Sequence, residues 1–199
     1  PSRCARAATP KRRTFLENHV SDIAAVDFFT VPTVTFQVLY CFVVLRHERR
    51  RVAPFNVTDS PTAAWTAQQV IQAFPYDEAP RYLVRDHDGI YGVVFRRRVK
   101  AMGIDEVLIA PQSPWQSPYV ERLVGSIRRE CVDHVIVLNE AHLRRILSQY
   151  FAYYHEDRAH LALERNAPIP RPIEQRNSGR VVSLPRVGGL HHRYSRRAA

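Results

Sequence analysis

Three acidic residues of this chain stand where a carboxylate could hold a metal ion. Asp27 lies inside the apolar run 23–31 (IAAVDFFTV), where a charged side chain is costly unless it is paired or binds a cation. Asp86 ends the run 81–86 (RYLVRD), and ligand-binding groups collect at the carboxyl ends of strands. Glu121 lies near the start of a predicted helix, at the edge of its apolar side. One acid in a central strand, one at a strand end and one on a flanking helix could meet at a single site.

The chemistry that such a site would support is metal-dependent phosphoryl transfer. Hard divalent cations such as Mg²⁺ need oxygen ligands, and few protein carboxylates suffice when the substrate supplies phosphate oxygens. Two such ions, roughly 3.5–4 Å apart, can activate an attacking hydroxyl and stabilise the leaving oxygen.

Each acid also has a plainer explanation. Asp27 could lie at a strand end near solvent, and Glu121 could interact favourably with the dipole at the start of its helix. Asp88 competes with Asp86 because strand alternation places both on the same side. The Asp-Gly pair that Asp88 begins is typical of a turn, however. We therefore expect Asp86 to be the ligand and Asp88 to form the turn.

The composition favours a polyanionic partner, although a basic surface without nucleic acid is the alternative on charge alone. The 199 residues carry a formal net charge of +10, and 45% of them are hydrophobic, as in a globular domain. The three cysteines are far apart and predict neither a disulfide framework nor a zinc cluster, which favours a reducing compartment. The longest apolar stretch, 38–45, is too short to span a bilayer, so no membrane partner is expected. Because the sequence starts at Pro1 without a Met, we expect it to be a piece of a longer protein.

The apolar pattern predicts an α/β fold with the order β-β-β-α-β-α-β-α-α. The first three strands have short connections, which force antiparallel neighbours. The later strands are joined through helices, giving a mixed sheet with helices on both faces. This is the order of the RNase H-like fold. The predicted strands cover 23–31, 34–46, 50–57, 81–86 and 107–110, and the predicted helices cover 61–74 (with Ser60 as N-cap), 93–102, 119–133 and 139–155 (with Asn139 as N-cap).

Three regions are expected along the chain. Residues 1–20 are basic and lack periodicity, so they are predicted to be an N-terminal arm or linker. Residues 21–165 form the predicted catalytic core. Residues 166–199 are rich in Pro and Arg and are predicted to be a basic C-terminal tail.

The text around the acids resembles a known family. Thirty-four residues separate Asp86 from Glu121, which resembles the D,D(35)E pattern of retroviral integrases and insertion-element transposases. The loop and helix at 110–122 (APQSPWQSPYVER) look like those that bring the family's catalytic Glu. The likeness runs from about residue 20 to residue 165, and it continues in SIRREC at 126–131, in YYH at 153–155, in RAH at 158–160 and in the ending PRVGGLHHRY at 185–194. We identify the chain as similar to the DDE-type integrase-core transposases of bacterial insertion elements.

This resemblance implies a DNA transposase or integrase. In such an enzyme two Mg²⁺ or Mn²⁺ ions would be held by Asp27, Asp86 and Glu121. The reactions implied are nicking at the element end and then attack of the freed 3′-hydroxyl on target DNA. The implied partners are double-stranded DNA and further copies of the chain, which would form a homo-multimer on that DNA. The implied location is the bacterial cytoplasm. His155 and Ala159 depart from the usual Asn and Pro but leave the acids intact. An inactive DNA-binding remnant and another RNase H-like nuclease are the alternatives.

Several further side chains are candidates for DNA contact. The basic cluster at 96–100 could follow phosphates, although an exposed helix face explains it equally well. The aromatic residues beside the Pro-rich loop could stack on bases or pack on the body. Gly125 lies one turn from Glu121 and would let a phosphate backbone come close. His87 could contact a phosphate, though a solvent-facing side chain is the simpler interpretation. The candidates are Arg96, Arg97, Arg98, Lys100, Trp115, Tyr119, Arg122, Arg128 and Arg129.

Overall fold

The computed structural model describes residues 19–75, 78–109 and 117–198. The predicted N-terminal arm therefore lies almost wholly outside the described residues, and so does Trp115. Among the helices that the structure describes, none has the length and apolar character needed to cross a membrane.

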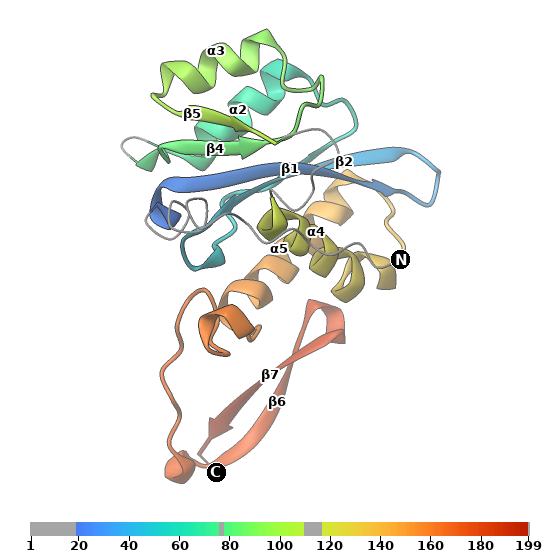
Figure 1. The fold of residues 1–199 in the computed structure, drawn as a ribbon. Coiled ribbons are helices and arrows are strands. Elements are labelled where there is room, and N and C mark those ends of the chain that lie inside the picture. The colour runs from blue at the N-terminus through green and yellow to red at the C-terminus, as the bar shows by residue number, and fades with distance from the viewer. Residues whose placement is uncertain (1–18, 76–77, 110–116, 199) are drawn as a thin grey trace, which may run out of the picture.

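A five-stranded mixed sheet forms the centre of the molecule (Figure 1), with the strand order β3-β2-β1-β4-β5. The central strand β1 pairs antiparallel with β2 and parallel with β4, and β5 extends the parallel side. The prediction of three antiparallel strands followed by two further strands is thereby confirmed. The strands are β1 (Ile23–Pro32), β2 (Val38–Arg46), β3 (Asn56–Thr58), β4 (Tyr82–Arg85) and β5 (Asp105–Leu108).

Helices cover both faces of this sheet, as predicted. In Figure 1, α2 (Ala63–Ala73) and α3 (Val93–Ala101) lie on one side of the sheet, and α4 (Pro118–Glu130) and α5 (Glu140–Glu156) lie on the other. Side chains alternate between the two faces along a strand. In β1, Ala24 and Val26 consequently belong to the core under α2 and α3, whereas Ala25 and Phe29 belong to the core under α4 and α5.

Two helix starts test the capping predictions. Asn139 caps α5 as expected, since its side chain accepts a hydrogen bond from the backbone N–H of His142 at 2.9 Å. The cap of α2 was predicted two residues too early. Thr62 rather than Ser60 caps this helix, and the Thr62 hydroxyl accepts the N–H of Trp65 at 3.1 Å. Ser60 and Thr62 are both short polar residues of the type that caps helices, and the structure uses the second of them.

The predicted strand 50–57 is mostly wrong. Only Asn56–Thr58 forms β3, and Val52 makes an isolated bridge to Leu45. The chain before it turns through the 3₁₀ segment Glu48–Arg50, where Arg49 and Arg50 adopt left-handed backbone angles (φ 45° and 56°) that no strand contains. The other 3₁₀ turns are Val20–Asp22, Val132–His134, Leu161–Leu163, Arg176–Ser178 and Val187–Gly189.

The predicted tail contains regular structure. A two-stranded ribbon is formed by β6 (Arg180–Arg186) and β7 (His191–Arg197), which pair antiparallel across the turn Val187–Gly189. At that turn Gly188 and Gly189 have positive φ angles (65° and 96°), which glycine adopts without steric cost. Val187 is buried in the core under α4 and α5, so the ribbon is docked at its turn. Its open end extends away from the sheet (Figure 1).

Candidate active site

Asp27 lies in the middle of β1, opposite Val43 of β2. Alternation along the strand puts its side chain on the same side as Ala25 and Phe29, which is the face that α4 covers. The side chain is partly buried, and its Oδ1 accepts the backbone N–H of Phe28 at 2.8 Å. This carboxylate has one protein donor and a largely apolar floor.

Asp86 follows directly after β4 and is exposed to solvent. Its Oδ1 accepts the backbone N–H of Asp88 at 3.2 Å, and Oδ1 of Asp88 accepts the N–H of Ile90 at 3.0 Å. Asp88 therefore forms the turn that the sequence predicted. His87 between them is exposed.

Arg85 fixes the backbone at Asp86. Its side chain is only 5% exposed, and its Nε donates to Oε2 of Glu106 on β5 at 2.5 Å. Its Nη1 donates to the carbonyl oxygen of Asp86 at 2.8 Å, and its guanidinium lies 5.1 Å from the ring centre of Tyr91. The sequence analysis did not single out this ion pair. Its sequence signal is an opposite charge on each of two short strands, YLVR and DEVL.

Glu121 lies in the first turn of α4 and is exposed, while its neighbours Val120 and Leu123 are buried against the sheet. The backbone N–H of Glu121 donates to the carbonyl of Ser117 at 3.3 Å. Partial desolvation raises the pKa of its carboxyl group above the ordinary value. The apolar stripe of α4 therefore brings the carboxyl group to the edge of the face that carries Asp27.

The three acids influence one another electrostatically. The pKa of Asp27 is raised to about 7, chiefly by burial and also by the negative charges of Asp86, Glu121 and Asp88, against the opposing effect of the Phe28 N–H bond. The charges of Asp86 and Glu121 thus contribute to the raised pKa of Asp27, which is the most buried of the three acids predicted as ligands.

Two properties decide whether these three acids could hold metal ions: the arrangement of their side chains and the chemistry of their donor atoms. Within the described ranges, no group of three His, Cys, Asp or Glu side chains is arranged to hold a metal ion. The chemistry of the donors does fit, because they are all carboxylates, and Asp27 loses its proton only reluctantly among like charges. A hard divalent cation would relieve that repulsion, and substrate phosphates could complete its coordination.

The candidate DNA-binding residues occupy several different places. The basic residues of α3 are exposed, but α3 lies on the opposite face of the sheet from α4 (Figure 1). Arg122 and Arg129 are exposed on α4, and the Arg129 guanidinium lies against Gly125, whose missing side chain makes room for it. Arg128 donates to the carbonyl of Thr30 at 3.2 Å, so it ties α4 to β1.

Tyr119 packs on the body of the protein, which was one of the two predicted possibilities. Its ring meets the ring of His47 edge-on at 4.8 Å between centres, and the Arg50 guanidinium lies 3.8 Å from its ring centre. These contacts fix the first turn of α4, two residues before Glu121.

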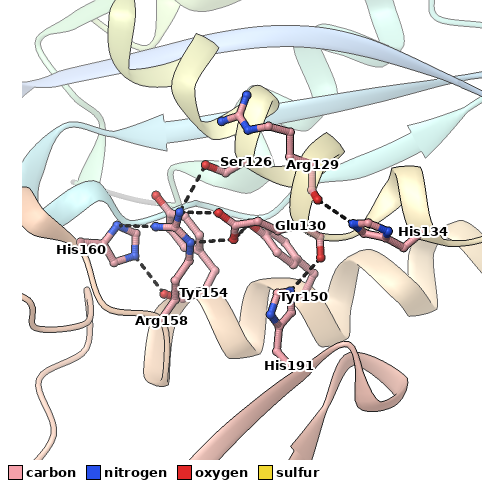
Figure 2. A network of polar contacts seen from close by, with 9 residues as sticks. All are labelled: Ser126, Arg129, Glu130, His134, Tyr150, Tyr154, Arg158, His160 and His191. Carbon is pink, nitrogen blue, oxygen red and sulfur yellow. Dashed lines mark hydrogen bonds and ion pairs between the residues drawn. The ribbon is translucent and has the colours of Figure 1, made fainter.

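A polar network behind α4 holds the other end of this helix (Figure 2). Glu130 accepts two hydrogen bonds from Arg158, at 2.8 Å from Nε and 2.5 Å from Nη2, and a third from the Tyr150 hydroxyl at 3.0 Å. Burial favours the neutral acid, but the bonds from Arg158 outweigh it and lower the pKa of Glu130. Ser126 and His160 lie beside the guanidinium at 3.4 Å and 3.3 Å. Glu130 and Arg158 fall within the motifs that carried the family resemblance, but the sequence did not predict that they pair.

The C-terminal ribbon joins the same network. His191 of β7 lies 2.7 Å from the carbonyl oxygen of Glu130, and its ring stacks on Tyr153 at 4.3 Å between centres (Figure 2 shows His191 below the helix). The helix that carries Glu121 is therefore held by β1, α5 and the ribbon together.

Comparison with known proteins agrees with this arrangement. Residues 102–168, which include Glu121, Glu130 and Arg158, match the model of the integrase core domain. An uncharacterized 39.2 kDa protein of insertion element IS476 from Xanthomonas euvesicatoria is 22% identical over 187 residues, covering 94% of this chain and 54% of that protein. The chain spans about half the length of this curated relative.

Solved structures share the fold of this chain. The simian T-cell lymphotropic virus intasome in complex with the PP2A regulatory subunit B56 gamma matches with a TM-score of 0.60 and 14% identity, over 87% of this chain and 66% of that chain. The Mos1 transposase catalytic domain with raltegravir and Mg matches with a TM-score of 0.60 and 14% identity, over 71% and 76%. The HTLV-2 integrase catalytic core domain with magnesium matches with a TM-score of 0.55 and 13% identity, over 68% and 87%. The predicted RNase H-like fold is confirmed.

Proposed function

We propose that this chain is the catalytic core of a DNA transposase or integrase that cleaves and transfers DNA strands at Asp27, Asp86 and Glu121. The observation that carries the proposal is the raised pKa of Asp27, to which burial and the charges of the two other acids contribute, in a chain with an integrase core domain. The HTLV-2 integrase core and the Mos1 catalytic domain contain magnesium, which supports Mg²⁺ or Mn²⁺ as the cofactor. In this proposal the working site holds two such ions.

Each acid has its own part in holding the cofactor. Asp27 is the central ligand, oriented by the Phe28 N–H and set against an apolar floor that excludes water from one side. Asp86 is the ligand at the strand end, with its backbone fixed by Arg85 and its carboxylate turned by the Asp88 N–H. Glu121 approaches from α4. When bound, the metal ions lower the pKa of the attacking hydroxyl and neutralise charge on the phosphate that is attacked.

The substrate in this proposal is double-stranded DNA, comprising the element ends and the target. The protein acts on bacterial DNA in the cytoplasm, because the curated relative belongs to a bacterial insertion element. Joining two element ends requires more than one copy of the core. The HTLV-2 integrase core occurs in dimeric and trimeric forms, and the simian virus protein occurs in an intasome, which supports a homo-multimer on DNA.

A strand-transfer assay tests the proposal. Labelled duplexes that carry the terminal sequences of the element are incubated with the protein and Mg²⁺ or Mn²⁺, and nicked and joined strands are separated by size. We expect joined products, and we expect Asp27→Asn, Asp86→Asn and Glu121→Gln each to abolish them. Asp88→Asn is the matched control, because Asn can form the same turn. Simple cleavage without joining would favour another RNase H-like nuclease, and DNA binding without either reaction would favour an inactive remnant.

A further inference from the structure

The C-terminal ribbon has one face against the core and one face in solvent. Residues opposite each other in the β6–β7 ladder share a face, and successive pairs alternate between faces. The inner face places Arg186 and Arg193 on the carboxylate of Asp157, and His191 on the ring of Tyr153. The outer face consists of the pairs Val181–Arg196, Ser183–Tyr194 and Pro185–His192. All of these except Arg196 are exposed, so this face is open along its whole length.

The ribbon and the turn before it are strongly basic. Residues 176–197 include six arginines and no Asp or Glu. Arg186 and Arg193 share one carboxylate, that of Asp157, with Arg171. In the part of the chain that the structure describes, no ion pair is recorded for the remaining four arginines of the segment. The fold thus gathers more positive charge here than the Asp157 carboxylate neutralises.

Four arginines meet at the open end of the ribbon, which we call the arginine end (Arg176, Arg180, Arg196 and Arg197). Arg180 and Arg197 are directly opposite each other in the ladder, an arrangement that is destabilising for like charges. The Arg196 guanidinium donates to the carbonyls of Arg176 at 3.3 Å and Gly179 at 3.0 Å, which holds it at the same end. A bound anion would remove this repulsion.

Gly179 permits this close approach of the two chain segments. Its φ angle is 116°, and a Cβ atom built on it would lie 2.1 Å from the carbonyl oxygen of Arg197. Only glycine can occupy this position without moving the backbone. The convergence of the arginine end is therefore built into the backbone and does not depend on flexible side chains alone.

A cavity of about 260 Å³ opens beside the arginine end. Arg193, Tyr194 and Arg196 contribute to its lining, and Tyr194 is 64% exposed. The lining also contains Glu174, whose carboxylate already accepts the backbone N–H of Arg196. The site therefore offers guanidinium donors and a largely exposed aromatic ring.

We propose that the arginine end of the ribbon binds the phosphate backbone of duplex DNA. Arginine matches phosphate oxygens with paired N–H donors, and DNA presents a negative charge every 3.4 Å or so along each strand. Seven residues of a strand extend over roughly 24 Å, so the ribbon can contact several successive phosphates. This surface would add DNA contacts away from Asp27, Asp86 and Glu121, so the inference rests on the proposed function.

The test is DNA binding by the whole chain in EDTA, which removes metal-dependent catalysis from the measurement. Fluorescence anisotropy of a labelled duplex is titrated at several salt concentrations for the wild type and for Arg180→Gln/Arg197→Gln. We expect the double variant to bind about tenfold more weakly at moderate salt and to lose about two from the slope of log affinity against log salt, because two phosphate contacts are removed. Without DNA, we expect its melting temperature to be equal to or higher than that of the wild type, because the like-charge pair is gone.

The matched control is Arg145→Gln/Arg165→Gln, which removes the same charge from exposed positions outside the ribbon. An equal loss of slope in this control, or an unchanged slope in the ribbon variant, overturns the proposal. Vesicles containing anionic phospholipid serve as a second probe, and binding to them with no DNA binding also overturns it. DNA binding that depends on the ribbon while strand transfer is absent supports the ribbon and refutes the proposed catalysis. If the wild type transfers strands and the ribbon variant binds DNA as well as the wild type, the proposed catalysis is supported and the ribbon proposal is refuted.

Discussion

Asp27 of β1 and Asp86 after β4 each lie two residues beyond the last matched pair of these parallel strands, in which Ala25 is opposite Val84. The two acids therefore reach the same level of the sheet from neighbouring strands, although 58 residues separate them in the chain. Parallel pairing in this register places the two residues at the same level on neighbouring strands, and α4, which carries Glu121, covers the face of β1 that carries Asp27.

Crowding of these carboxylates should cost stability when no metal is bound. We expect Asp27→Asn to raise the free energy of unfolding at pH 8 by about 1–2 kcal/mol, because a partly buried charge beside like charges is removed. Urea unfolding in EDTA measures this. Addition of Mg²⁺ should stabilise the wild type and leave the variant unchanged. A variant that is less stable than the wild type in EDTA would mean that the carboxylate is satisfied by the protein alone.

The Arg85–Glu106 pair should matter far more than surface ion pairs. Glu106→Gln leaves the buried Arg85 guanidinium without a compensating charge, and we expect a loss of about 3–5 kcal/mol in urea unfolding. Glu78→Gln, which breaks the more exposed pair with Arg46, is the matched control and should cost about 0–1 kcal/mol. Equal effects of the two substitutions would show that Arg85 is not held by Glu106.

The hydroxyl of Tyr150 should stabilise the network behind α4. Tyr150 is fully buried, and Tyr150→Phe removes only the hydroxyl that donates to Glu130. We expect a loss of about 1.5–3 kcal/mol in urea unfolding, as for a hydrogen bond to a charged group. A loss within measurement error would indicate that Arg158 alone satisfies the Glu130 carboxylate.

His155 should make the protein sensitive to mild acid. Burial lowers its pKa to about 4, with Arg51 and His160 contributing, and its Nε2 accepts the backbone N–H of Val52 at 3.0 Å. A base whose pKa is lowered on folding stabilises the folded state above its unfolded pKa of 6.5, and this stability is lost as pH falls from 6.5 towards 4. We expect melting curves of His155→Asn to depend less on pH over this range than those of the wild type.

The bond made by His155 also accounts for one departure from the family pattern. The sequence placed His155 where relatives of this type usually have Asn, and the structure gives it the task of accepting one backbone N–H. An Asn side-chain oxygen can perform the same task. Nothing in the structure explains Ala159 in place of the usual Pro.

The sequence predicted the order of elements along the chain and both helical layers, because the long elements have clear apolar periods. It could not predict that Arg49 and Arg50 adopt left-handed angles, and so it extended a strand through the turn before β3. The C-terminal ribbon was missed because Pro, Gly and Arg dominate its composition. Its stability comes from contacts with Val187, His191 and Asp157, which are tertiary and leave no local pattern.

At the candidate site, residue type and spacing predicted Asp27, Asp86 and Glu121 as ligands, and the charges of Asp86 and Glu121 contribute to the raised pKa of Asp27. They could not predict the supports, since Arg85–Glu106 and Glu130–Arg158 join residues 21 and 28 positions apart. Pairs of this kind depend on strand and helix packing rather than on any repeat in the sequence. The metal ligation of the three acids stays a prediction.

The bond between His191 and the last carbonyl of α4 has a mechanical consequence. Glu121 and Glu130 are nine residues apart on one continuous helix, which corresponds to about 13 Å of a stiff rod. The ribbon is thus bonded to the opposite end of the helix whose first turn carries Glu121.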